Sequence, residues 1–261
     1  MINQNCLSYW FPLLQGAGLP VPRTEIVRCE SDLSPLLDGD DPDGYIEFLE
    51  ALESAGGRIG FPCFLRTGQT SNKHDWNKSC YVKRPDVLPV HVANLVEFSA
   101  LADFLGLPTN VWAVRELLPT MPLGVCERYG GMPVCKEFRF FVRDGKIQCW
   151  HPYWPLPTLI EGGFVANVNR DCYEHLCYPG NGERKLRLLA ISTADVLPGY
   201  WSVDILETKR GWKITDCALG DQSFHCLDCE HCPVEMRKQY TDREKSRQSR
   251  LLKKDHGDEL R

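Results

Sequence analysis

The sequence lacks a long apolar run and a secretory start. No stretch approaches the roughly 18 to 20 apolar residues that cross a bilayer. Residues 1–6 show no basic segment followed by an apolar one. The closing Gly-Asp-Glu-Leu resembles an endoplasmic-reticulum retention signal, but Arg261 follows it, whereas that signal ends in Leu. We therefore expect a cytoplasmic protein with no membrane partner.

The sequence also lacks the commonest nucleotide-binding and hydrolase motifs. It contains no Gly-x-x-x-x-Gly-Lys-Ser/Thr loop, no Gly-x-Gly-x-x-Gly after a strand and no Gly-x-Ser-x-Gly elbow. It contains no internal repeat either. If the protein binds a nucleotide, a different arrangement of side chains must hold it.

The composition is that of a globular protein. The chain has 261 residues, of which 43% are hydrophobic and 25% charged, enough for one large core or two modest ones. Its net charge of -5 argues against a dedicated nucleic-acid partner. The 13 cysteines are scattered and odd in number, so we expect reduced thiols, most of them buried.

Apolar periodicity and turn residues outline the elements. Gly56 and Gly57 are predicted to stop the first of three helices, and Asp144 with Gly145 predicts a tight hairpin turn. The pattern predicts helices at 45–55, 88–105 and the second half of 174–198, strands at 19–27, 61–66 and 111–118, and hairpins at 136–150 and 201–219. The composition after Val234 is charged and indicates an exposed helix or tail.

The last hairpin carries two aspartates within apolar strands. Asp204 and Asp216 are expected to lie side by side on adjacent strands, separated by a turn at 209–211. A buried carboxylate is unfavourable unless it is paired or holds a cation, so this arrangement predicts a shared Mg²⁺. The alternative is a pair of edge-strand aspartates in water.

Basic side chains recur before this hairpin at places where strands end or loops begin. Arg66 ends a strand, Lys73 and Lys78 lie in a polar loop, and Lys136 and Arg139 lie on the preceding hairpin. Polyphosphate binding requires several cations and a bridging divalent ion, and Mg²⁺ commonly takes only one or two protein carboxylates. Any one of these cations taken alone indicates only a solvated surface charge. Together they predict a phosphate-and-metal site.

Two segments near these charges leave two interpretations open. His74 and Asp75, beside Lys73, either touch a ligand or form a local turn hydrogen bond. The ring-rich segment 150–155 either lines a substrate pocket or packs over the sheet.

Over residues 60 to 226, this order of charged strands and loops resembles the ATP-grasp superfamily, and most of all its R-two-K clade. It is more distantly similar to the cell division cycle family of ATP-grasp proteins that assemble a translation initiation factor. The segments that carry the resemblance are 61–66, 73–76, 137–142 and 203–204.

The resemblance implies an α+β ATP-grasp fold in which two lobes clasp a nucleotide. The implied organisation is a pre-ATP-grasp segment at 1–58, an ATP-grasp domain at 59–233 and a charged tail at 234–261. Within the domain, the small lobe is expected at about 59–118 and the large lobe at about 119–233.

The resemblance also implies roles for individual residues. Arg66 and Arg139 would bind phosphate and act in catalysis, and Lys73 would lie in the flexible phosphate loop. A linker at 116–118 would hydrogen-bond adenine. The full set of implied ATP-binding residues is Arg66, Lys73, Arg115, Glu116, Leu117, Leu118, Lys136 and Arg139.

The metal ligands implied by the resemblance depart from the family pattern at one position. Asp204 and Asp216 would hold Mg²⁺, but the family commonly ends its last strand with acid-x-Asn. Here Ala218 stands at the Asn position and offers no ligand atom. Asp221, three residues further on, is the expected substitute, or a water fills the position.

By resemblance, the chain is an ATP- and Mg²⁺-dependent ligase that joins a carboxylate to an amine through an acylphosphate. Its partners would be small-molecule or peptide carboxylates and amines. The alternative is a non-catalytic ATP-binding assembly factor with a protein partner, which Ala218 favours.

A third hypothesis is a zinc-binding interaction module. His225, Cys226, Cys229 and Cys232 include three thiols at intervals of three residues, with spacing that a Zn²⁺ ion can use. All four ligands would come from only eight consecutive residues, which leaves little room for tetrahedral geometry. We therefore favour free thiols over zinc.

Overall fold

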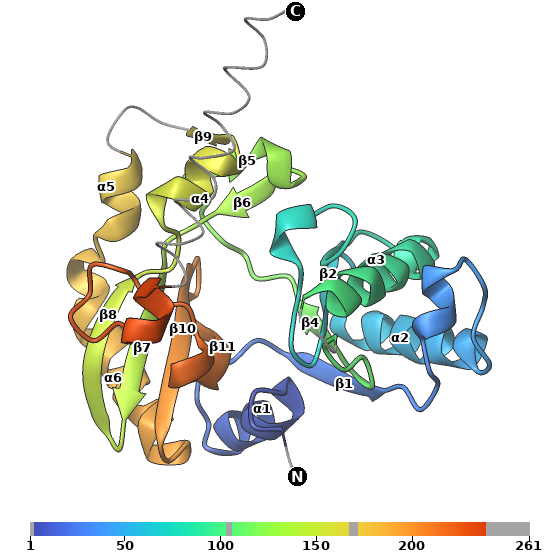
Figure 1. Ribbon diagram of the computed structural model, residues 1–261, viewed down its shortest axis with the longest axis horizontal. Coiled ribbons are helices and arrows are strands. Elements are labelled where there is room, and N and C mark those ends of the chain that lie inside the picture. The colour runs from blue at the N-terminus through green and yellow to red at the C-terminus, as the bar shows by residue number, and fades with distance from the viewer. Residues whose placement is uncertain (1–2, 103–105, 167–171, 239–261) are drawn as a thin grey trace, which may run out of the picture. The chain divides into compact units, whose positions relative to one another are not determined.

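The computed structural model describes residues 3–102, 106–166 and 172–238 (Figure 1). The chain divides into a first compact unit, Met1–Gly220, and a second, Asp221–Arg261. The first unit is an α+β structure built around three sheets whose strand pairs are all antiparallel. None of the helices in the described ranges combines the length and apolar character that a membrane span requires.

The first sheet has the strand order β1-β4-β2-β3. Helices α2 and α3 pack against it, and their apolar stripes form one core with the strands. The strands are β1 (Thr24–Arg28), β2 (Cys63–Thr67), β3 (Tyr81–Val82) and β4 (Val111–Glu116), and the helices are α2 (Tyr45–Ile59) and α3 (Leu88–Leu101). Short 3-10 turns connect them: η1 (Ser34–Leu37), η2 (Lys73–Asp75) and η3 (Pro85–Val87).

The predicted stop of α2 at Gly56 and Gly57 is wrong. The helix continues to Ile59 and ends at Gly60, whose φ of 101° is left-handed. Gly56 is required for a different reason, because a Cβ at this position would collide with the Phe61 ring. This glycine therefore makes room for close packing, whereas Gly60 ends the helix.

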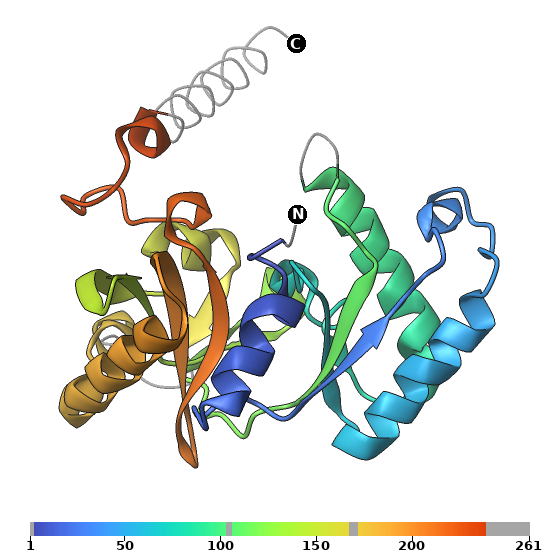
Figure 2. The same cartoon turned by 90° about the horizontal axis from the view of Figure 1, so that it is seen from below.

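The second sheet has the order β11-β10-β7-β8, and its apolar face packs on α1 and α6. Its strands are β7 (Glu137–Arg143), β8 (Lys146–Pro152), β10 (Tyr200–Thr208) and β11 (Gly211–Leu219), and the helices are α1 (Leu7–Gly16) and α6 (Glu183–Val196). The predicted turn at Asp144 and Gly145 is confirmed, with positive φ at both residues. In Figure 2, α1 (dark blue) lies between this sheet and the first, and its Leu7 N–H donates to the Gly68 carbonyl at 2.7 Å.

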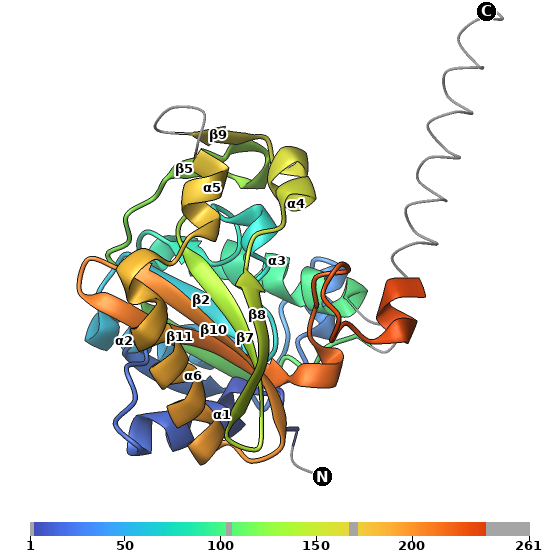
Figure 3. The ribbon, with the colours of Figure 1, turned by 90° about the vertical axis from the view of Figure 1, so that its left-hand side faces the viewer.

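The third sheet, in the order β6-β5-β9, was not predicted because its strands are only three residues long. It has its own small core, in which Tyr129 and Trp154 take part. Figure 3 shows it with the short helices α4 and α5. These elements are β5 (Gly124–Cys126), η4 (Glu127–Tyr129), β6 (Met132–Val134), α4 (Leu156–Glu161), β9 (Phe164–Ala166), α5 (Cys172–Cys177) and η5 (Gly180–Gly182).

The second unit begins within η6 (Gly220–Gln222) and includes a short helical segment at 234–238. The rest of the predicted charged tail, 239–261, lies outside the described residues. Every cysteine whose side chain the structure describes is a free thiol, and most are buried, as predicted. Burial raises the pKa of Cys63 and of Cys80 to about 12, so these thiols are unreactive.

Candidate functional site

A cavity of about 450 Å³ is lined by residues from all three sheets of the first unit. This volume lies within the range of small-molecule binding sites. Apolar side chains such as Phe64 and Leu206 form part of the wall, and the charged side chains form the rest. The sequence-predicted residues that line it are Arg66, Lys73, Arg115, Glu116, Leu117, Leu118 and Asp216.

The two aspartates of the last hairpin are direct partners across strands β10 and β11, as predicted. Side chains of directly opposite residues point to the same face of a sheet. Their surroundings nevertheless differ. Asp204 is 3% exposed, whereas the side chain of Asp216 is 39% exposed and lines the cavity.

Asp204 is paired with Arg139 on the neighbouring strand β7. The pairing follows from the sheet register, which sets Arg139 directly opposite Asp204. Nε and Nη2 of the arginine donate to the two carboxylate oxygens at 2.7 and 2.8 Å. Burial alone would lower the pKa of Arg139, but the Asp204 carboxylate raises it overall. Both oxygens of Asp204 are therefore used within the protein.

Asp216 is paired with Arg66 at the end of β2. Nη1 of Arg66 lies 2.9 Å from Oδ1 of Asp216, which also accepts a hydrogen bond from the Cys217 N–H at 3.1 Å. This ion pair links the first sheet to the second. Because its carboxylate is open to the cavity, Asp216 is the better placed of the two aspartates to meet a ligand.

A third carboxylate, Glu137, was not predicted as a site residue. It is buried and lines the cavity. Oε2 of Glu137 lies 3.5 Å from Nζ of Lys73, and Oε1 accepts a hydrogen bond from the Thr215 hydroxyl at 3.1 Å. Glu137 stands two positions before Arg139 on β7, so strand alternation was the signal that places both on one face.

Thr215 reaches Glu137 because the hairpin contains a β-bulge. Asp204 pairs with Asp216, but Ile205 pairs with Ile214, which leaves Thr215 as the extra residue on β11. Its hydroxyl lies within hydrogen-bond distance of the Asp204 carbonyl, at 3.2 Å, as well as of Glu137. Nothing in the local sequence indicates this bulge.

Lys73 is held by a carboxylate on one side and aromatic rings on the other. Its Nζ lies 4.6 Å from the ring centroid of Tyr153 and 5.7 Å from that of Trp154. The guanidinium carbon of Arg139 lies 4.9 Å from the same Tyr153 ring. Burial would lower the pKa of Lys73, but Glu137 and the neighbouring anions raise it overall. The ring-rich segment thus contributes to the site, as one of the two interpretations allowed.

Arg115 is the cation in the cavity wall whose charge is least compensated. Its Nη1 donates to the Thr215 carbonyl at 2.7 Å and its Nε to the Thr24 hydroxyl at 3.3 Å. Its Nη2 is buried and has no hydrogen-bond partner among the described residues. Burial and the nearby charge of Arg66 lower the pKa of Arg115 to about 9. A buried donor of this kind favours an anionic ligand.

The linker after β4 runs along the cavity. The carboxylate of Glu116 accepts a hydrogen bond from the Arg23 N–H at 2.9 Å, and the Glu116 N–H donates to the Arg23 carbonyl at 2.9 Å. Leu117 and Leu118 follow it along the cavity wall. The β1–β4 pairing therefore fixes the start of the linker.

Three other predicted residues are placed differently. Lys136 is half-buried and is not among the residues that line the cavity. Ala218 pairs with Ser202, two positions beyond Asp216 on the same face, where it offers no ligand atom. Asp221 is exposed and belongs to the second unit, so its role as a metal ligand stays a prediction.

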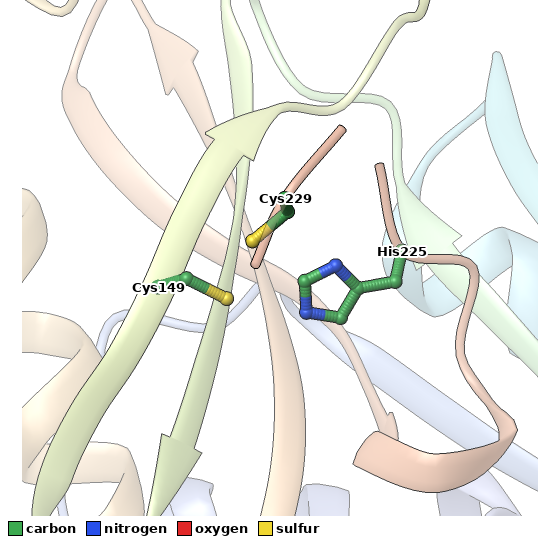
Figure 4. A group of neighbouring side chains, drawn as sticks. All are labelled: Cys149, His225 and Cys229. Carbon is green, nitrogen blue, oxygen red and sulfur yellow. The ribbon is translucent and has the colours of Figure 1, made fainter. Parts of the chain in front are cut away.

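The predicted zinc ligands all lie in the second unit. A ring nitrogen of His225 and Sγ of Cys229 lie within 4.8 Å of each other (Figure 4). No three of the predicted four, His225, Cys226, Cys229 and Cys232, form a metal-ligand group in the part of the chain that the structure describes. Zinc binding by the four predicted residues therefore stays a prediction.

The residues of the cavity fit a polyphosphate better than an uncharged ligand. Glu137, Asp204 and Asp216 each pair with one cation, and Glu116 pairs with the exposed Arg23, whereas Arg115 has no ion pair among the described residues. This leaves one positive charge in excess and an unpartnered buried donor beside it. Asp216 also offers an accessible oxygen donor of the kind that Mg²⁺ prefers.

The three sheets and their helices form an α+β fold, as predicted, and the solved structures that are similar to this chain include ATP-grasp proteins. No family model and no curated protein matches the sequence. Among solved structures, the chain is similar to C-terminally truncated Cdc123 from Schizosaccharomyces pombe, with a TM-score of 0.54 and 13% identity. That match covers 84% of this chain and 86% of the other.

Two further similar structures are less alike. The RimK domain protein ATP-grasp from Sphaerobacter thermophilus has a TM-score of 0.45 and 16% identity over 83% of this chain. The D-alanine–D-alanine ligase from Bacillus anthracis, complexed with ATP, has a TM-score of 0.43 and 11% identity over 82%. This chain spans only 59% and 54% of the lengths of these two proteins.

Proposed function

We propose that the cavity binds ATP with Mg²⁺ and that the chain is an ATP-dependent ligase of the carboxylate-amine type. The observation that supports this most strongly is the group of Arg66, Lys73 and Arg115 in the cavity wall beside Asp216. The linker at 116–118 runs along the same cavity and is suited to read the adenine edge. The reaction would form an amide or peptide-like bond through an acylphosphate.

The roles that we expect for the side chains differ with their surroundings. Arg66 and Arg115 would bind phosphate oxygens, and Lys73 would add a mobile cation from its loop. Such groups stabilise the charge that develops on a transferred phosphoryl group. Asp216 would hold Mg²⁺, which when bound neutralises phosphate charge. Asp204 is better suited to orient Arg139 than to hold the metal, because Arg139 takes both of its oxygens.

A second candidate function is ATP binding without catalysis, in a factor that assembles a protein partner. Two observations favour it: Ala218 offers no metal ligand, and Asp204 is engaged by Arg139. The sequence resemblance to the cell division cycle family implies the same kind of role. Here ATP would stabilise a partner-binding surface.

The experiment that tests the proposal is a calorimetric titration of ATP with Mg²⁺ into the protein and into Arg66→Ala. Arg84→Ala is the matched control, because Arg84 is an exposed arginine that pairs with Asp86 and does not line the cavity. We expect binding to the wild type and to Arg84→Ala, and at least about tenfold weaker binding to Arg66→Ala, since a charged hydrogen bond contributes about 1.5 to 3 kcal/mol. Absence of ATP binding by the wild type would exclude both candidate functions.

Turnover separates the two candidates. The protein is incubated with ATP, Mg²⁺ and mixtures of carboxylates and amines, including peptides, and the release of ADP and phosphate is measured. Release that depends on both a carboxylate and an amine supports the ligase. ATP binding without release, together with a protein partner whose binding requires ATP, supports the assembly factor instead.

A further inference from the structure

The loop that carries Lys73 connects strands of the first sheet, yet its next side chains lie on the third sheet. The exposed ring of His74 is parallel to the buried ring of Tyr129, with the centroids 4.2 Å apart and an angle of 8° between the planes. Two positions later, the Trp76 N–H donates to the Tyr129 carbonyl at 3.2 Å. The turn η2 thus packs on η4 and on β6.

A glycine makes this close approach possible. Gly130 follows Tyr129 with a φ of 68°, and a Cβ added there would lie 3.1 Å from the Asn77 nitrogen and 3.4 Å from the Trp76 nitrogen. The next residue, Gly131, has a similar φ of 74°, but its Cβ would meet only Nδ2 of Asn77, at 3.9 Å. The backbone of the loop therefore rests directly on Gly130.

The loop is held together by its own hydrogen bonds. The hydroxyl of Ser79 lies 2.6 Å from the Asn72 carbonyl and 2.7 Å from the Asp75 carbonyl, and the Asp75 N–H donates to the Asn72 carbonyl at 3.0 Å. Lys73 lies within the segment that these bonds close, between Asn72 and Ser79. If this segment left the third sheet, Lys73 would move away from Glu137 with it.

We propose that His74, Trp76 and Asn77, resting on Tyr129 and Gly130, form a latch that holds Lys73 in the cavity. Tyr129 and Gly130 are then positioning residues that act through Lys73. The role of Lys73 on phosphate rests on the proposed function, but the latch does not, because its contacts form without a nucleotide.

The latch is suited to open and close. The contacts between the loop and the third sheet are one ring stack, one backbone hydrogen bond, one close contact and the packing of the half-buried Trp76 against the core of that sheet. A loop held by a small set of contacts opens at a lower free-energy cost than the fold as a whole. In the closed state Lys73 is paired with a buried carboxylate, which raises its pKa and keeps the amine protonated. An amine-directed reagent attacks only the neutral amine, so its reaction with Lys73 reports how often the latch is open.

The test labels the full-length protein with acetic anhydride in the absence of nucleotide. Mass spectrometry gives the rate at Lys73, with the exposed Lys146 as an internal reference. We expect Gly130→Ala to raise the rate at Lys73 about threefold to tenfold, the change that corresponds to the loss of one aromatic stack. Gly131→Ala introduces the same left-handed strain without the tight contact to the loop backbone and should leave the rate unchanged.

A second pair of variants guards against a general effect on folding. His74→Ala removes the ring stack from the exposed side and should raise the labelling rate of Lys73. His74→Phe keeps a ring at this position and should leave the labelling rate close to that of the wild type. Equal labelling in Gly130→Ala and Gly131→Ala, or failure of His74→Phe to restore the wild-type rate, would overturn the latch. If labelling changes as expected while ATP affinity does not, the latch stands and the assignment of Lys73 to phosphate fails.

Discussion

The two strands of the acidic hairpin carry aspartates at the same level of the second sheet but in different surroundings. Strand β10 is central, between β7 and β11, whereas β11 is an edge strand. Asp204 on the central strand is buried, and both of its carboxylate oxygens accept hydrogen bonds from Arg139. Asp216 on the edge strand is partly open to the cavity and makes one ion pair with Arg66. The position of a strand in the sheet thus decides whether its carboxylate is buried with both oxygens paired or stays open to the cavity.

The largest expected effect comes from breaking the buried pair. Asp204→Ala leaves the Arg139 guanidinium buried without its carboxylate, which should lower the free energy of unfolding by about 3 to 5 kcal/mol. Urea denaturation measures this effect. A double variant, Asp204→Leu with Arg139→Met, replaces the pair by apolar groups and should recover most of the loss. Equal destabilisation by Asp204→Ala and Asp216→Ala would contradict the comparison.

The edge-strand aspartate should affect ligand binding more than stability. Asp216→Asn should lower the free energy of unfolding less than Asp204→Ala does, because Asp216 is 39% exposed to water, although the buried Arg66 loses its carboxylate. It should weaken the binding of ATP with Mg²⁺ about tenfold or more, since a metal ligand is lost. Binding of ATP without Mg²⁺ should be retained or tightened, because Arg66 is released from its carboxylate. Calorimetry with and without Mg²⁺ measures both, and equal losses in the two conditions would argue against a metal at Asp216.

Arg115 gives a prediction with a pH signature. Its folded-state pKa of about 9 lies below its ordinary value, so between these two values the unfolded chain binds more protons than the folded one. The contribution of Arg115 to stability is therefore lowest below pH 9 and rises as the pH increases above it. Arg115→Met should remove this rise and weaken ATP binding. Thermal unfolding at pH 7.5 and 9.5 compares the two proteins, and parallel pH curves would contradict the assignment.

The smallest expected effect is at the bulge. Thr215→Val removes the hydroxyl near Glu137 and should lower the free energy of unfolding by about 1 kcal/mol, the contribution of one hydrogen bond. Thr215→Ser keeps the hydroxyl and serves as the control in the same denaturation experiment. If valine and serine behave alike, the hydroxyl is not what stabilises Glu137.

Local sequence patterns predicted most elements of the first two sheets and failed where the tertiary structure overrides them. The Asp144-Gly145 hairpin was predicted because both residues accept a positive φ. The end of α2 was misplaced because Gly56 serves packing against Phe61. The third sheet was missed because strands of three residues carry no readable alternation.

The candidate site was predicted by residue type but not by partner. Half of the predicted cations and aspartates line the cavity, and the other four, Lys136, Arg139, Asp204 and Asp221, do not. Glu137 was overlooked because a single carboxylate at the start of a strand forms no motif, although strand alternation places it on the same face of β7 as Arg139. Its place in the site follows from its contacts in the tertiary structure, with Lys73 from the loop and with Thr215 on β11.

The sequence by itself determined the hairpins, the main helices and the presence of opposed carboxylates, because turn chemistry and side-chain alternation act over a few residues. Only the tertiary structure decided which cation each carboxylate binds, where Thr215 points and what holds Lys73 in the cavity. These depend on strand order, on one β-bulge and on contacts between segments far apart in the chain. Such long-range pairings are fixed by the burial of the whole sheet, which no local pattern encodes.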